Sequence, residues 1–216
     1  MKFLSVFLIF LLTMNGAFAA KELNKEFTKT LSKYSTAQNV EVGLKKTDEK
    51  AALGTKSVSE GILKFAKDKI YIMLNGEKKI EFFYKKNTVW LIEYPDLDFD
   101  KDGKRKVAVL KKSTPVLMSG LINLFSNQKK FLKEFKVVSE KQEGNNLTIE
   151  FLPKQKNLKS FTLIIDKKDR LIKQVIFTDD IDTKTTLDLS NLKLNKKMSS
   201  SEFDYKKLKS DEVTYE

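Results

Sequence analysis

The sequence has 216 residues, no cysteine and no histidine, and its formal net charge is +12. This composition excludes disulfide bonds, serine–histidine triads, cysteine nucleophiles and the usual zinc ligands. The positive charge would suit anionic partners, but the basic residues are spread along the whole chain without an aromatic-interleaved motif, so we predict a solvated lysine-rich surface and no nucleic-acid partner.

The N-terminus has the layout of a secretory signal peptide. Lys2 precedes an apolar run over residues 3–12, and small residues follow at Ala19 and Ala20. The run is about half the length that a transmembrane helix needs. We therefore predict cleavage after Ala19 or Ala20 and export from the cytoplasm.

The predicted organisation is a signal peptide over residues 1–20 and one domain over residues 21–216. A domain of this size can bury a core without disulfides. A bacterial lipoprotein carries its lipid on a cysteine at the cleavage junction, and this chain has no cysteine. We therefore expect a soluble periplasmic protein.

The mature chain begins with helical spacing and then changes to strand spacing. Apolar residues predict an amphipathic helix over residues 22–34. From residue 40 apolar and polar residues alternate, and short turns favour antiparallel neighbours. The strands predicted here are 40–44, 61–65, 70–74, 80–84, 88–93 and 107–110.

Helices then interrupt the strands. Ser113 or Thr114 can cap a helix, and Pro115 suits its first position. A second short helix is predicted over residues 127–135. Strands resume at 136–138, 147–152, 160–165, 171–177 and 183–189, and the polar C-terminal segment offers Phe203 and Tyr205 as last strand contacts.

This order of elements predicts a mainly β, α+β fold. A sheet of about eleven strands must curl, close or split. A strongly curved antiparallel sheet with helices over its open side would bury one face. Strands 80–84 and 88–93 are apolar on both alternation phases, so either both faces are covered or one lines an apolar cavity.

Two acidic clusters are candidate sites. Asp98, Asp100 and Asp102 match the opening of a calcium loop, but Val109 stands where the closing acid should be. We expect a turn that does not hold calcium tightly. The cluster at 179–182 is typical of a turn, and nothing pairs its carboxylates for glycoside hydrolysis. No metal or cofactor site is predicted.

The sequence resembles the LolA family of periplasmic outer-membrane lipoprotein carrier proteins. The resemblance rests on the order and spacing of several segments, together with the signal peptide. These segments are Gly61-Ile62-Leu63-Lys64-Phe65-Ala66-Lys67, Thr88-Val89-Trp90-Leu91 with Pro95, Thr114-Pro115-Val116-Leu117-Met118-Ser119-Gly120, and Leu152-Pro153-Lys154 with Phe161-Thr162-Leu163.

The resemblance implies an incomplete barrel in which helices form a lid over an apolar cavity for lipoprotein acyl chains. It implies a monomeric, non-enzymatic carrier without a cofactor. Its partners would be an inner-membrane ABC transporter that releases lipoproteins and an outer-membrane lipoprotein acceptor. The alternative is a periplasmic scaffold or regulatory module of the same architecture that binds a protein partner.

We expect the lipid-binding cavity to be lined by positions that follow from strand alternation and helical spacing. The aromatic ones among them could instead lie on the outer face, and the simpler alternative is a filled core. The predicted cavity residues are Phe65, Phe82, Trp90, Leu117 and Leu121.

The resemblance also implies a lid latch. The family has an arginine followed by proline after its early strand, and this sequence has Lys67 and Asp68 there. Lys67 would face backbone carbonyls near Met118, Ser119 and Gly120. Lysine lacks the planar fork of arginine and makes fewer oriented hydrogen bonds, so the latch would be looser. The alternative is a solvated lysine at a strand end.

Overall fold

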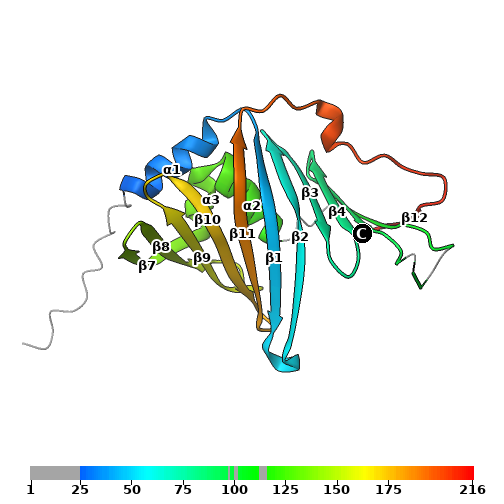
Figure 1. The fold of residues 1–216 in the computed structure, drawn as a ribbon, viewed down its shortest axis with the longest axis horizontal. Coiled ribbons are helices and arrows are strands. Elements are labelled where there is room, and N and C mark those ends of the chain that lie inside the picture. Colours follow the sequence, from blue (N-terminus) through cyan, green and yellow to red (C-terminus); the bar gives the residue numbers. More distant parts are fainter. Residues whose placement is uncertain (1–24, 97, 100–101, 112–115) are drawn as a thin grey trace, which may run out of the picture.

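The computed structural model describes residues 25–96, 98–99, 102–111 and 116–216, without the side chains of residues 116–119 and 126. The predicted signal peptide, the helix-capping positions Ser113, Thr114 and Pro115, and Asp100 of the acidic turn lie outside the described residues. The rest is one curved sheet with helices gathered on its inner side (Figure 1).

Twelve strands form a single sheet in the order β12-β6-β5-β4-β3-β2-β1-β11-β10-β9-β8-β7. The pairs are antiparallel except β12 with β6, which is parallel. Because the edge strands β12 and β7 do not pair with each other, the barrel is incomplete, as predicted. The strands are β1 (Val40–Lys50), β2 (Thr55–Ala66), β3 (Lys69–Asn75), β4 (Ile80–Lys85), β5 (Thr88–Glu93), β6 (Lys106–Leu110), β7 (Phe135–Glu143), β8 (Asn146–Pro153), β9 (Leu158–Asp166), β10 (Leu171–Asp179), β11 (Thr183–Leu194) and β12 (Glu212–Tyr215).

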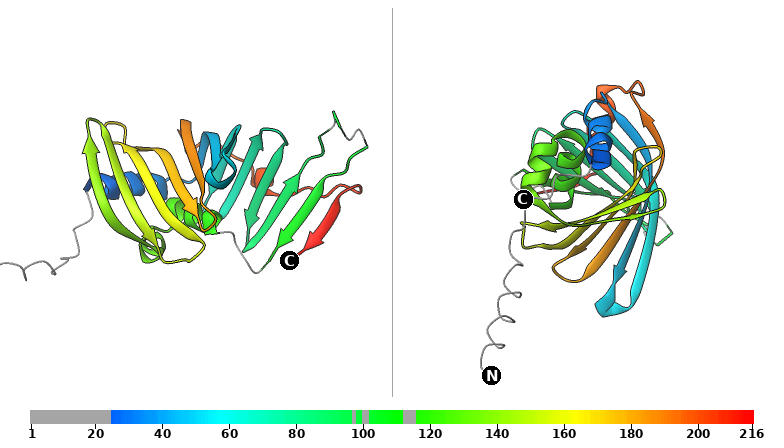
Figure 2. Two further views of the ribbon diagram at one scale, coloured as in Figure 1. Left: turned by 90° about the horizontal axis from the view of Figure 1, so that it is seen from below. Right: turned by 90° about the vertical axis from the view of Figure 1, so that its left-hand side faces the viewer.

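Irregular pairing accompanies the curvature of the sheet. The register shifts between Glu41 and Gly43 in β1, and between Ile172 and Gln174 in β10. Such bulges bend a strand and increase its local twist. The sheet therefore has a concave and a convex face, which the two views of Figure 2 show from below and from one end.

The helices α1 (Lys25–Ser35), α2 (Val116–Ser126) and α3 (Gln128–Glu134) lie on the concave side (Figure 2). The Asn127 side chain caps α3 by accepting a hydrogen bond from the Lys130 amide at 3.0 Å. Two short 3₁₀ turns, η1 (Ala51–Leu53) and η2 (Ser200–Phe203), complete the described elements.

The apolar residues of strands β3 to β6 divide between two cores, one on each face of the sheet. Ile70 and Ile72 join the main core on the concave side. A second, smaller core on the convex side contains Phe83, Ile92 and Val107. The C-terminal segment crosses this convex face and ends in β12 (Figure 1).

The sequence-based boundaries differ from the structure mainly at polar segments. Strand β2 begins at Thr55 rather than Gly61, because residues 55–60 continue the pairing with β1 down to Lys50. Strand β12 was not expected, since its polar sequence carries little apolar alternation. It forms through backbone pairing with the sheet edge at β6.

Candidate functional site: the concave face and its helices

Helix α1 is fixed to the sheet by one apolar face and one buried hydrogen bond. Phe27, Leu31 and Tyr34 are each 1% exposed. The Ile172 amide donates to the Tyr34 hydroxyl at 3.0 Å, beside the bulge in β10. Burial raises the pKa of Tyr34 to about 12, so its hydroxyl stays protonated at neutral pH.

Helix α2 lies over the centre of the concave face. Phe125 packs against Phe65 of β2 and against Tyr34 of α1, with ring centroids 6.0 Å and 5.3 Å away. Leu121 and Leu124 are 2% and 0% exposed. The sequence of α2 contains no charged residue, which is unusual for a helix on the outside of a domain.

Helix α3 covers an aromatic cluster near the β7 edge. Phe131 stacks on Phe135 at 4.6 Å and meets Phe151 and Phe161 edge-on at 5.3 Å and 5.6 Å. A side chain at Gly120 of α2 would lie 3.2 Å from the Phe135 ring. The absence of a side chain at Gly120 therefore allows α2 to approach this cluster closely.

Most of the predicted cavity residues lie together on the concave side. Phe65 and Leu121, each 2% exposed, belong to the main core, and half-buried Phe82 packs against it. The side chain of Leu117 lies outside the described part of the structure. Phe65 and Leu121 pack among the other side chains of the main core, and their role in a lipid-binding cavity stays a prediction.

Trp90 lies on the opposite face from Phe65 and Phe82. It is the register partner of Phe83, whereas Phe82 pairs with Leu91, and successive side chains point to opposite faces. Trp90 packs against the second core and stacks on Tyr205 at 6.5 Å. The sequence identified the alternation but not which phase faces inward.

The predicted latch is only partly described. Lys67 is exposed in the turn between β2 and β3 and has a positive φ of 54°. The backbone at Met118, Ser119 and Gly120 belongs to the first turns of α2, but the side chains of Met118 and Ser119 lie outside the described residues. The latch therefore stays a prediction.

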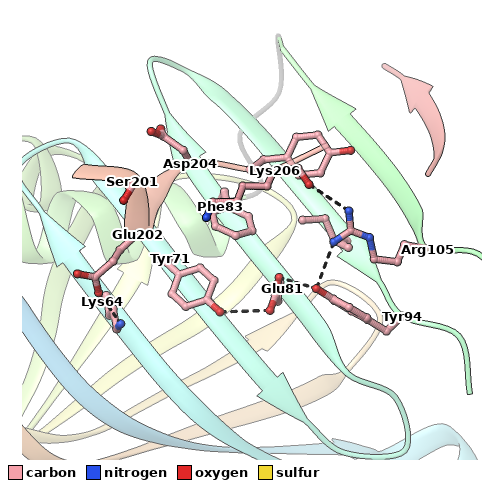
Figure 3. A pocket seen from close by; sticks show the side chains of 12 residues that line it. Lys64, Tyr71, Glu81, Phe83, Tyr94, Arg105, Ser201, Glu202, Asp204 and Lys206 are labelled. Carbon is pink, nitrogen blue, oxygen red and sulfur yellow. Dashed lines mark hydrogen bonds and ion pairs between the residues drawn. The ribbon is translucent and has the colours of Figure 1, made fainter. Parts of the chain in front are cut away.

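The convex face carries a polar pocket of about 330 Å³ that sequence reasoning did not identify (Figure 3). Glu81 lies at its base and accepts hydrogen bonds from Tyr71 at 3.2 Å and Tyr94 at 3.0 Å. Lys79 pairs with the same carboxylate at 2.9 Å. Burial, and then the Glu81 charge, raise the pKa of Tyr71. The only sequence signal was a charged residue within an apolar strand.

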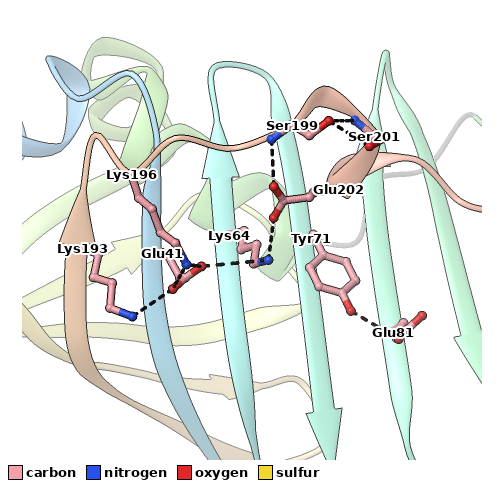
Figure 4. Close-up of polar contacts among 9 residues, drawn as sticks. All are labelled: Glu41, Lys64, Tyr71, Glu81, Lys193, Lys196, Ser199, Ser201 and Glu202. Carbon is pink, nitrogen blue, oxygen red and sulfur yellow. Dashed lines mark hydrogen bonds and ion pairs between the residues drawn. The ribbon is translucent and has the colours of Figure 1, made fainter.

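Ion pairs join the C-terminal segment to the sheet beside this pocket. Glu202 of η2 binds Lys64 at 2.7 Å and completes a capping box by accepting from the Ser199 amide (Figure 4). Asp204 pairs with Lys85. We call residues 197–216 the C-terminal strap.

A two-pronged ion pair between Arg105 and Asp211 also holds the strap. The Arg105 Nε and Nη2 atoms donate to the two carboxylate oxygens at 2.8 Å and 2.7 Å, and the Asp211 side chain is 0% exposed. The hydrogen bonds from Arg105 lower the pKa of Asp211 to about 2. Tyr205 donates to the same carboxylate at 2.6 Å.

The two acidic turns are surface features in the structure. Asp98 and Asp102 are exposed. Asp179 accepts hydrogen bonds from the amides of Ile181 and Thr183 at 3.1 Å and 2.8 Å, which is the turn geometry that its sequence predicts. In the part of the chain that is described, no helix is long and apolar enough to cross a membrane.

Comparisons with known proteins identify the family and the fold. The family described as "Outer membrane lipoprotein carrier protein LolA" matches residues 36–206. No curated protein matches the chain. Several solved structures are similar to this chain. Their sequence identities to it are so low that the likeness concerns the fold alone.

One similar structure is an uncharacterized conserved protein from Thermus thermophilus, with 10% identity and a TM-score of 0.50 over 88% of this chain and 98% of that chain. A LolA superfamily protein from Nitrosomonas europaea has 8% identity and a TM-score of 0.44, covering 82% and 97%. The MucA/MucB complex of Pseudomonas aeruginosa has 11% identity and a TM-score of 0.40, covering 84% and 60%.

Proposed function

The chain belongs to the family of outer membrane lipoprotein carrier proteins, LolA, and on this premise we propose that it is an exported, periplasmic carrier of lipoproteins. Its concave face beneath α1, α2 and α3 would bind the acyl chains. The observation that carries the proposal is the uncharged helix α2 lying over an apolar concave surface. A helix without a charged side chain suits an apolar ligand better than one with a charged face.

Acyl binding in this fold requires the helices to move. Phe65 and Leu121 are almost fully buried, so an acyl chain must replace side-chain contacts between α2 and the sheet. Each buried methylene contributes about 0.8 kcal/mol, and displaced protein contacts offset part of this. The resulting moderate affinity suits a carrier, which must release its cargo to an acceptor.

The proposed partners follow from the same role. Lipoproteins would be received from an inner-membrane ABC transporter and passed to an outer-membrane acceptor after removal of residues 1–20. In this role the protein binds and releases lipoproteins and catalyses no reaction. A protein partner in place of a lipid is the alternative outcome of the experiments below.

The direct test is titration of the purified protein with a fluorescent fatty-acyl probe. We expect saturable binding that Phe82→Ser weakens, because Phe82 is half-buried on the concave side. Trp90→Ser is the matched control, since Trp90 lies on the convex face, and its probe affinity should be unchanged. Circular dichroism verifies that both variants are folded.

Native mass spectrometry of protein purified from the periplasm tests the cargo. We expect co-purified lipoprotein in the wild type and less of it in Phe82→Ser. If the protein binds no acyl probe and instead co-purifies with an unacylated protein in stoichiometric amount, the carrier proposal is wrong and the scaffold alternative is favoured.

The latch is tested by Lys67→Leu, with Lys86→Leu as its control. Both lysines are exposed in two-residue turns with similar φ values of 54° and 51°. We expect Lys67→Leu to loosen the closed state and change transfer of bound lipoprotein to acceptor membranes. Equal transfer by the two variants and the wild type would show that Lys67 is a solvated surface lysine and not a latch.

A further inference from the structure

The outer surface of α3 is basic. The helix buries Phe131, which is 0% exposed, against the aromatic cluster. Its exposed side carries Lys129, Lys130 and Lys133. This helix therefore adds a row of positive charge to the helical cover of the concave face.

Neighbouring segments extend this positive surface. The Lys154 amide donates to the Glu134 carbonyl at 2.9 Å, which holds the loop between β8 and β9 against the end of α3. Lys154 and Lys156 of that loop are exposed, as is Lys136 at the start of β7. We call the cluster the basic end, and its members are Lys129, Lys130, Lys133, Lys136, Lys154 and Lys156.

Within the described part of the chain, no acid forms an ion pair with the lysines of the basic end. The ion pairs found among the described residues include none of its lysines. Of the nearby acids, Glu134 accepts from the Asn123 amide group at 3.0 Å and Glu150 accepts from Ser139 at 2.7 Å. By contrast, lysines near the centre of the sheet, such as Lys64 and Lys193, are paired with acids (Figure 4).

Two exposed apolar side chains lie close to Lys136 at the β7 edge, and Leu152 points to the sheet face opposite α3. Leu152 is 53% exposed and is the register partner of Lys136. Val138, 55% exposed, lies at the bulge of β7 two residues beyond Lys136. Exposed aliphatic side chains beside unpaired lysines are typical of surfaces that contact lipid headgroups.

We propose that the basic end docks this protein on the anionic surface of a lipid bilayer. Lysines near such a surface each strengthen binding about fivefold, without a fixed geometry. The cluster has flexible lysines in place of arginines, whose planar forks suit oriented contacts with a protein partner. Leu152 and Val138 add apolar contact at the level of the headgroups.

Membrane docking goes beyond acyl binding and does not depend on it. The basic end includes the outer side of α3, and the inner side of α3 covers the concave face. A protein bound in this way holds its helical cover close to the bilayer from which cargo is taken or to which it is given. Figure 2 shows α3 beside the β7 edge in its end view.

The test uses the mature protein without cargo and vesicles of phosphatidylcholine with or without one third phosphatidylglycerol. Flotation should show binding to the anionic vesicles and little to the neutral ones. Raising the salt concentration should release the protein, because exposed charges are screened within about 10 Å at 0.1 M salt. Acyl-probe affinity is measured in parallel as an independent readout.

The variant Lys129→Gln/Lys133→Gln/Lys156→Gln should bind anionic vesicles on the order of a hundredfold more weakly. The control Lys78→Gln/Lys207→Gln/Lys209→Gln removes the same charge from exposed lysines elsewhere and should bind nearly as well as the wild type. Equal losses in the two variants would show that net charge alone drives binding and would overturn the proposal. Binding of an acidic protein in place of anionic vesicles would also overturn it, while unchanged acyl-probe affinity leaves the carrier role intact.

Discussion

Single buried polar contacts fix the segments that cover the sheet. The bulge in β10 leaves the Ile172 amide to donate to Tyr34, which joins α1 to the sheet. In Tyr34→Phe this buried amide loses its partner. We expect a loss of about 1–3 kcal/mol in the free energy of unfolding, measured by urea denaturation.

Tyr215→Phe is the control for this substitution. Tyr215 is 67% exposed, so removal of its hydroxyl should leave the free energy of unfolding unchanged. If Tyr34→Phe is as stable as this control, the hydrogen bond to Ile172 contributes nothing and packing alone holds α1.

At the same scale, the Arg105–Asp211 pair leads us to expect that the C-terminal strap detaches from the sheet at acidic pH. The pKa of Asp211 is lowered to about 2, below its unfolded value of about 3.9. The pair therefore stabilises the strap above about pH 4, and this contribution is lost as the pH falls from about 4 to about 2. Trp90, the single tryptophan, stacks on Tyr205 of the strap and reports its release.

We expect the Trp90 emission to stay constant from pH 7 to about pH 4 and to shift below it. In Asp211→Asn the shift should be present already at pH 7, because the charge that holds Arg105 is missing. Asp180→Asn, in an exposed turn, should behave as the wild type. An emission maximum in Asp211→Asn that matches the wild type at pH 7 would contradict this role.

At the scale of elements, the close approach of β2 and β3 depends on Gly61. A Cβ atom at this position would lie 1.8 Å from the backbone carbonyl oxygen of Met73. The strands must separate to admit a methyl group, and we expect Gly61→Ala to destabilise the fold by about 3 kcal/mol or more. Thermal unfolding followed by circular dichroism measures the loss.

Gly43→Ala in β1 is the matched comparison. Its added methyl group meets the Ser190 hydroxyl at 2.7 Å, and this side chain can rotate away. The loss of stability should therefore be clearly smaller than for Gly61→Ala. Equal losses would show that backbone proximity at Gly61 is not the deciding factor.

At the scale of the whole molecule, acyl uptake should depend on relative motion of the helices. Gln128 of α3 donates to Ser35 at the end of α1 at 3.2 Å, and the sequence contains no cysteine. In Ser35→Cys/Gln128→Cys a disulfide would join the two helices. We expect oxidation to block binding of the fatty-acyl probe and reduction to restore it.

Each single cysteine variant is the control and should bind the probe under both conditions. Mass spectrometry verifies that the disulfide has formed. If the oxidised double variant takes up the probe as fast as the reduced one, entry does not require α1 and α3 to separate.

Much of the concave site could be predicted from the sequence. Helical spacing predicted that Leu121 lies on the buried side of α2. Strand alternation separated the two faces of β2 but did not decide that the face of Phe65 is the buried one. The convex pocket around Glu81 could not be predicted, because Tyr94, Arg105 and Asp211 come from separate segments. The polar sequence of the C-terminal strap does not indicate that this segment folds back across strands β3 to β6.

The sequence by itself determined the helices, the strands other than β12 and the curved, mainly antiparallel sheet, because periodicity and turns are local properties of the chain. Only the tertiary structure decided which apolar phase faces the helices. Phe82 and Trp90 both follow strand alternation, yet one faces the concave core and the other lies under the strap. That choice depends on strand register and on which distant segment covers each face, and both are set by contacts between residues far apart in the chain.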